Sequence, residues 1–141
     1  MYKRQALHYA ATRAAKTGGG VEVLAIITPQ DQTHWLGVAE KMREEARETI
    51  EESFQIYSNW MKDELKLEAE LVIREGEKAT EVLNQISEDK EVGVLVLGAN
   101  NSSEGPGPLI SQLVSRDGGN LPIPVTIVPG SMTKERIEAV S

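Results

Sequence analysis

Two apolar segments decide how this sequence folds: Val92-Gly93-Val94-Leu95-Val96-Leu97-Gly98 and Pro122-Ile123-Pro124-Val125-Thr126-Ile127-Val128. Each is rich in β-branched residues, so each predicts a strand. Continuous apolar runs are typical of strands that are covered on both faces, as in a parallel sheet. We therefore expect 92–97 to be the most buried strand of the chain. Between the two segments, a loop of small and polar residues runs to Gly107, and Pro108 suits the first turn of a helix.

The rest of the chain alternates helices with strands. Apolar residues at helical spacing predict further helices over 6–16, 36–65, 78–88 and 133–140. Gly18 is a suitable stop for the first of them. Val21–Ile27 predicts a strand covered on both faces, whereas 67–73 alternates apolar with charged residues and predicts a half-buried strand near a sheet edge. The order α-β-α-β-α-β-α-β implies parallel strands joined by right-handed crossovers.

These elements predict the α/β class, with three layers, α/β/α, around a mostly parallel sheet. We expect one domain over residues 1–130 and a C-terminal tail over residues 131–141 that forms a short, exposed helix. An alternating α/β domain usually opens with a strand, which is often the central one. Met1–Gln5 is too short and too charged to be that strand, so we expect that the recorded chain begins late.

Composition excludes several kinds of function. Among 141 residues, 15 are basic and 22 are acidic, and the net charge of −7 opposes binding to nucleic acid or to anionic lipid. No cysteine is present, so disulfides and cysteine-based metal or redox sites are excluded. The longest apolar runs are too short to span a bilayer. We expect a cytoplasmic protein that binds neither nucleic acid nor membranes.

No familiar catalytic pattern occurs in the chain. It has no Gly-x-Ser-x-Gly elbow, no Walker lysine and no pairing of carboxylates that suggests acid–base chemistry. The two histidines do not have metal-site spacing. His8, on the first helix, is expected at the boundary of the core and not as a proton donor or metal ligand. His34, beside Trp35, either contacts a ligand or covers the core. The acidic face of the 36–65 helix predicts a solvated surface or, alternatively, a surface for a basic partner. We expect no enzyme activity.

The segment from Val92 to Val128 resembles the universal stress protein family. In that family, a strand ends in glycine, as at Gly98, and is followed by a glycine-rich loop, a helix and a Pro-x-Pro-Val lead into the last strand, as at Pro122–Val125. The likeness extends over nearly the whole chain, since 9–16 resembles the first helix of the family and 21–29 its second strand. It implies the adenine nucleotide alpha hydrolase-like fold with strand order 3-2-1-4-5, the first strand being missing here.

Some members of this family bind ATP through a signature of Gly, two residues, Gly, nine residues, and then Gly followed by Ser or Thr. In this chain those four positions are Gly98, Asn101, Ser111 and Gln112, and only the first matches. The resemblance implies that a nucleotide would contact these residues, Asn100, and Ile26 of the second strand. Residues 91–115 contain no Lys or Arg to balance a triphosphate, and Glu104 adds a negative charge.

The resemblance also implies homodimers that form through the last strand. Residues 125–128 are an apolar segment between prolines, and pairing at a sheet edge would satisfy its backbone groups and place Val125 and Ile127 in the interface. The leading hypothesis is a regulatory or binding module of the stress response that acts as a homodimer without catalysis. The alternative is an ATP-binding protein with weak or no ATPase activity.

Overall fold

The structure, a computed structural model, describes residues 4–28, 36–99, 108–116 and 121–141. Four strands form two separate parallel pairs. β1 (Val21–Ile27) pairs with β2 (Ala69–Glu75), from Val21 opposite Ala69 to Ile27 opposite Glu75. β3 (Leu95–Ala99) pairs with β4 (Val125–Pro129), from Leu95 opposite Val125 to Ala99 opposite Pro129. The predicted α/β class with parallel strands is confirmed.

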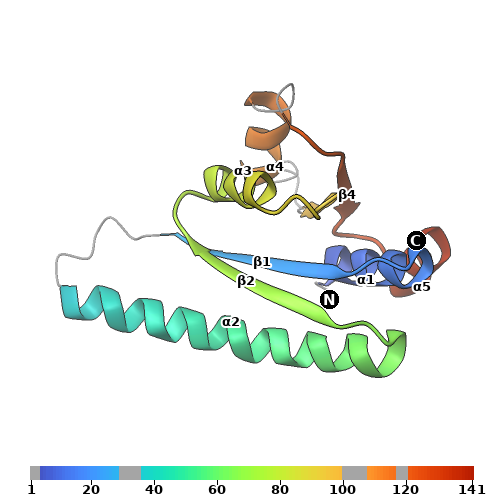
Figure 1. Ribbon diagram of the computed structural model, residues 1–141, viewed down its shortest axis with the longest axis horizontal. Helices are drawn as coiled ribbons and strands as arrows, with labels where there is room; N and C mark the ends of the chain where they lie inside the picture. Colours follow the sequence, from blue (N-terminus) through green and yellow to red (C-terminus); the bar gives the residue numbers. More distant parts are fainter. Residues whose placement is uncertain (1–3, 29–35, 100–107, 117–120) are drawn as a thin grey trace.

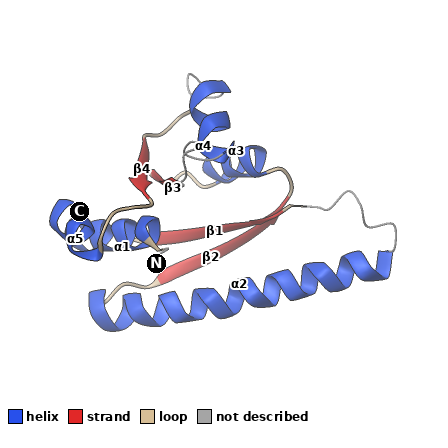
Figure 2. Ribbon diagram, turned by 180° about the vertical axis from the view of Figure 1, so that it is seen from behind, coloured by secondary structure: helices blue, strands red, loops and turns tan. Residues whose placement is uncertain are grey.

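Helices lie on both sides of the β1–β2 pair, which gives the three layers that the sequence predicts. The long helix α2 (Leu36–Leu65) follows one side, while α3 (Lys78–Glu88) and α4 (Pro108–Ser111) lie on the other (Figure 1). A π-helical turn, η1 (Gln112–Arg116), continues α4. Figure 2 shows the same arrangement from behind, with β3 and β4 set apart from the longer strands. The bounds of α2 and α3 match the predicted ranges.

The first helix, α1 (Gln5–Thr17), joins the two strand pairs because it contacts both. Its alanines allow this close approach, since Ala11 is fully buried and the methyl group of Ala6 lies 3.5 Å from where a Cβ on Gly98 would stand. Gly18 ends the helix as predicted, with a φ of 77° that favours glycine.

The C-terminal helix α5 (Lys134–Val140) packs against α1. Thr133 caps its first turn by accepting a hydrogen bond from the backbone N–H of Arg136. Ile137 is fully buried, and the Lys16 ammonium donates to the carbonyl oxygen of Ser141 at 2.8 Å. The predicted helix is therefore present, but it buries one side and is not wholly exposed.

The main buried cluster lies between α3, η1 and the strands. Its fully or nearly buried members are Ala79, Val82, Ile86 and Leu113. Half-buried residues of β1 and β3, such as Leu24 and Leu97, pack against them. The helical segment that begins at Pro108 thus covers the strands.

Two expectations about burial are wrong. Residues 92–97 were expected to form the most buried strand, yet the strand begins at Leu95, its residues are half-buried or exposed, and Val94 is 51% exposed. All seven residues of β1 are half-buried rather than covered on both faces. The cause is common to both strands: within the described parts of the chain, β1 pairs only with β2 and β3 only with β4, so each leaves one edge open.

Candidate functional site

The open edges of β1 and β3 border a cavity of about 370 Å³, which α3 closes from one side. Its walls are mainly apolar and come from separate elements. Leu24 and Ile26 of β1 face Val82 and Ile86 of α3, and residues 94–97 and Leu109 complete the lining. The cavity is partly open to solvent, so it is a groove between these elements and not an interior void.

Polar side chains line this mostly apolar cavity at two positions, near the start of β1 and at the start of α3. Glu22, near the start of β1, accepts a hydrogen bond from the Gln85 side-chain amide at 2.7 Å, and both residues line the cavity. Burial raises the pKa of Glu22, and a hydrogen bond with the Asp89 carboxyl adds to this shift. Lys78 also lines the cavity, at the first residue of α3. Because α3 follows the end of β2, Lys78 lies toward the carboxyl ends of the strands.

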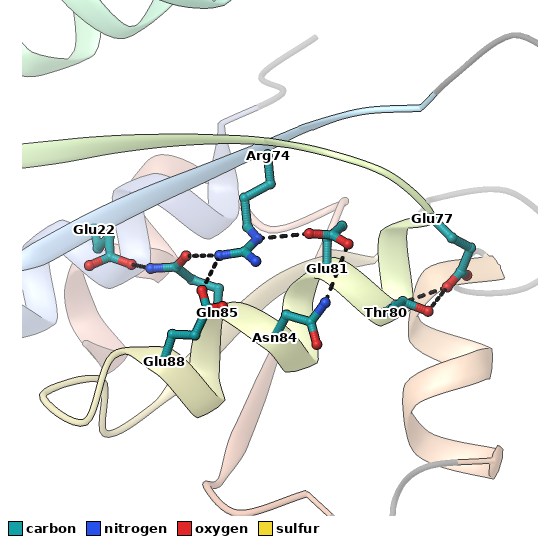
Figure 3. A network of polar contacts seen from close by, with 8 residues as sticks. All are labelled: Glu22, Arg74, Glu77, Thr80, Glu81, Asn84, Gln85 and Glu88. Carbon is teal, nitrogen blue, oxygen red and sulfur yellow. Dashed lines mark hydrogen bonds and ion pairs between the residues drawn. The ribbon is translucent and has the colours of Figure 1, made fainter.

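A network of polar contacts extends from Glu22 along the face of α3 that meets the strands (Figure 3). The guanidinium of Arg74 donates to Glu81 at 2.8 Å, to Gln85 at 2.9 Å and to Glu88 at 2.6 Å. This interaction holds the pKa of the Glu88 carboxyl below its usual value. The network fixes Gln85, and through it Glu22, at the border of the cavity.

Backbone geometry at Gly76 supports the same network. This residue links β2 to α3 with a φ of +149°, a conformation that other residues rarely adopt. A Cβ at Gly76 would stand 2.8 Å from the side chain of Glu81. The glycine that follows β2 therefore also leaves room for the partner of Arg74.

The structure brings together only some of the nucleotide-binding residues that the resemblance implied. Ile26 lines the cavity. Gly98 lies in β3 next to α1, where a Cβ would stand at an ordinary contact distance of 3.5 Å from the methyl group of Ala6. Ser111, the last residue of α4, and Gln112, the first of η1, are both exposed. Asn100 and Asn101 lie outside the described residues, so the nucleotide site stays a prediction.

Lys78 and Gln85 are cavity residues that sequence reasoning did not single out. Residues 91–115, which form the predicted nucleotide loop and helix, contain no Lys or Arg, whereas Lys78 comes from an earlier helix. Its position after β2 was a usable signal, because the helix that follows a parallel strand begins at the carboxyl edge of the sheet. Gln85 carried no comparable signal, since its role depends on how α3 is rotated.

The predicted dimer residues lie on a strand with an open outer edge. In the described residues, β4 pairs with β3 alone. Val125 is half-buried and Ile127 is 41% exposed. Their placement fits an edge, and the dimer itself stays a prediction.

The histidine His8 is almost fully buried where α1 meets α2 and α5. Its ring meets Trp60 edge-on at 5.2 Å between centroids, and its Nε2 lies 3.3 Å from the Glu138 carboxylate. Burial lowers its pKa, which Glu138 opposes and Lys134 reinforces. His8 is therefore more deeply buried than the boundary position that the sequence predicts. His34 and Trp35 lie outside the described residues.

Within the described residues, no group of three or more His, Asp and Glu side chains is placed to hold a metal ion. No helix in the same residues combines the length and the apolar character needed to cross a bilayer.

Comparisons with known proteins agree with this architecture. The sequence profile of the universal stress protein family matches residues 2–129. A solved structure, the universal stress protein UspA from Lactobacillus plantarum, superposes with a TM-score of 0.75 at 14% sequence identity, over 89% of this chain and 88% of that one. A search of curated proteins gives no match. Since the family profile covers most of the chain and the fold agrees, this chain belongs to the universal stress protein family.

Proposed function

We propose that this chain is a regulatory or binding module of the stress response, located in the cytoplasm, which acts as a homodimer through β4 and performs no catalysis. The observation that carries the dimer is the open outer edge of β4. Leu95 donates its backbone N–H to the carbonyl of Pro124, so the backbone groups of even-numbered β4 residues face β3. Those of Val125 and Ile127 therefore face outward, because successive residues of a strand alternate in direction.

An open apolar edge favours pairing with another strand. A second copy presents the same strand, and two-fold symmetry would bring the two β4 edges together and satisfy the outward groups of both. The exposed side chain of Ile127 would then be covered by its partner.

The test is the replacement Ile127→Lys, since an edge lysine opposes strand pairing. Sedimentation velocity should show a shift from dimer to monomer at equal protein concentration. The matched control is Ile56→Lys, which alters another exposed isoleucine, on α2. A dimer that survives Ile127→Lys, or one that both changes weaken equally, contradicts the proposed interface.

ATP binding is the second candidate function, and Lys78 is the observation that favours it. This lysine and Ile26 both border the cavity, and open α/β sheets bind ligands beyond the carboxyl ends of their strands. Ile26 would pack against the base of a nucleotide, and the Lys78 ammonium would balance the charge of its phosphates.

Titration with fluorescently labelled ATP tests this alternative. Saturable binding that Lys78→Gln weakens, while Lys41→Gln on the exposed surface of α2 does not, would support it. If the unmodified chain shows no saturable binding, the ATP-binding alternative is refuted, and the proposal of a binding module that takes no nucleotide stands.

A further inference from the structure

A second cavity, of about 200 Å³, lies where α1 meets the C-terminal half of α2 and the start of α5. α1 contacts both of these helices, and α1, α5 and the C-terminal end of α2 lie at the same end of the molecule (Figures 1 and 2). Pockets for drug-sized ligands have volumes of about 300–1,000 Å³, so this one suits a smaller molecule. The lining of this aromatic cavity combines three ring side chains, two cations and one leucine: His8, Tyr57, Trp60, Arg4, Lys134 and Leu7.

The three rings come from two helices. Tyr57 and Trp60 are three residues apart on α2, a spacing that places both on one face of the helix. The ring of His8, on α1, meets Trp60 edge-on with 5.2 Å between centroids. Tyr57 and Trp60 are only half-buried, so part of each ring is open to the cavity. Such surfaces attract another aromatic ring through stacked or edge-to-face contacts.

Two exposed cations border the same space. The guanidinium of Arg4 lies 4.5 Å from the centroid of the Tyr57 ring, a cation–π contact that holds the group without neutralising its charge. Lys134 is the first residue of α5. Among the described residues, neither cation forms an ion pair with a carboxylate, whereas Arg74 has two carboxylate partners. The cavity therefore offers two uncompensated positive charges in a chain whose net charge is −7.

Neither cation is placed where it stabilises its own helix. The N-terminus of a helix carries a partial positive charge, so acidic residues such as Glu135 are favourable there and cations are not. Lys134 nevertheless begins α5, and Arg4 directly precedes α1, whose first turn has no acidic side chain. A negatively charged ligand in the cavity explains these two positions better than the stability of either helix does.

We propose that the aromatic cavity binds a small aromatic carboxylate, whose ring packs against Tyr57 and Trp60 and whose carboxylate pairs with the two cations. The Glu138 carboxylate lies 3.3 Å from Nε2 of His8, and it would repel a doubly charged phosphate more strongly than a singly charged carboxylate. The match to the family profile ends at residue 129, so α5 and its lysine lie beyond the shared domain. The proposal depends neither on the dimer through β4 nor on the cavity between β1 and β3.

Phenylacetate is the probe, because it combines one ring with one carboxylate. Acetate lacks the ring and phenylacetamide lacks the charge, so these controls separate the two kinds of contact. Binding is followed by the NMR shift of the Trp60 indole N–H in the full chain, and Trp35→Phe leaves Trp60 as the single tryptophan. We expect a saturable shift with phenylacetate, and an affinity for either control that is lower by about fivefold or more.

Charge removal supplies matched variants of the protein. Lys134→Gln and Arg4→Gln should each weaken phenylacetate binding by about two- to five-fold, as expected for exposed ion pairs, and should leave phenylacetamide binding unchanged. Arg136→Gln on α5 and Arg13→Gln on α1 remove exposed charges that do not line the cavity, and should alter neither affinity. Tyr57→Leu should weaken binding of both compounds, whereas Tyr57→Phe, which keeps the ring, should not.

Three results would overturn the proposal. The first is a Trp60 signal that does not shift, or that shifts without saturation, when phenylacetate is added. The second is acetate or phenylacetamide binding as tightly as phenylacetate, or phenyl phosphate binding more tightly. The third is an equal loss of phenylacetate affinity in Lys134→Gln and in its control Arg136→Gln, because the effect would then reflect the overall charge of the chain and not a contact in the cavity.

Discussion

Replacing Leu113 by alanine tests whether the segment after the Gly- and Pro-rich stretch packs onto α3. Leu113 is fully buried in the cluster with Val82 and Ile86, whereas its neighbour Val114 is 52% exposed. Leu→Ala removes three carbon atoms, or about 2.4 kcal/mol of transfer free energy, and the cavity left behind adds to this cost. We expect a loss of about 3 kcal/mol in the free energy of unfolding.

For a chain of this length, that loss corresponds to a fall in Tm of about 10 °C. Urea unfolding followed by circular dichroism gives the free energy, and thermal melts give the Tm. Val114→Ala is the matched control and should change stability by no more than about 0.5 kcal/mol. If the two variants lose equal stability, or if Val114→Ala loses more, then η1 is not rotated as described and the covering helix is wrongly placed.

Two further predictions concern the helices that pack against α1. Burial lowers the pKa of His8, so below about pH 6.5 the unfolded chain binds more protons than the folded one, and stability falls as the pH drops, by at most about 1.4 kcal/mol per pH unit. His8→Gln should reduce this slope in urea titrations between about pH 5 and pH 7.5, and an unchanged slope would refute the assignment. Ile137→Ala should cost about 2–5 kcal/mol because its side chain is fully buried, whereas Val140→Ala, at an exposed position, should be nearly neutral. Equal urea midpoints for these two variants would mean that α5 does not dock on α1.

Local pattern predicted most of the fold. The bounds of α2 and α3 follow from the helical spacing of apolar residues, and Gly18, Gly76 and Pro108 act where their backbone preferences place them. The parallel direction of both strand pairs follows from the alternating order of helices and strands. These features depend on local backbone preferences and on the spacing of apolar residues, both of which can be seen in a single sequence.

Burial of the strands could not be predicted in the same way. Apolar content shows what a strand is suited to contact, not whether a neighbour is present. Val94, just before β3, is as apolar as a core residue and is nevertheless half-exposed, because no strand among the described residues pairs with the second edge of β3. Among the described residues, no strand lies between β1 and β3.

The side-chain site was the least predictable part. Arg74 bonds to Gln85 and Glu88, which lie about one turn apart on α3. The sequence does not define how this helix is rotated against the strands. Lys78 could be placed at the correct edge from topology alone. Gly98 lies at ordinary contact distance from Ala6, and its predicted contact with a ligand stays a prediction.

The most direct test of this account is residue-resolved amide hydrogen exchange of the chain alone, measured by NMR. The account predicts alternation: slow exchange at Val23, Ala25, Leu95 and Leu97, which bond to neighbouring strands, and fast exchange at Leu24, Ile26 and Val96, which face the cavity. Uniform slow exchange along β1 and β3 would show that both edges are already paired, and would contradict the split between the two strand pairs.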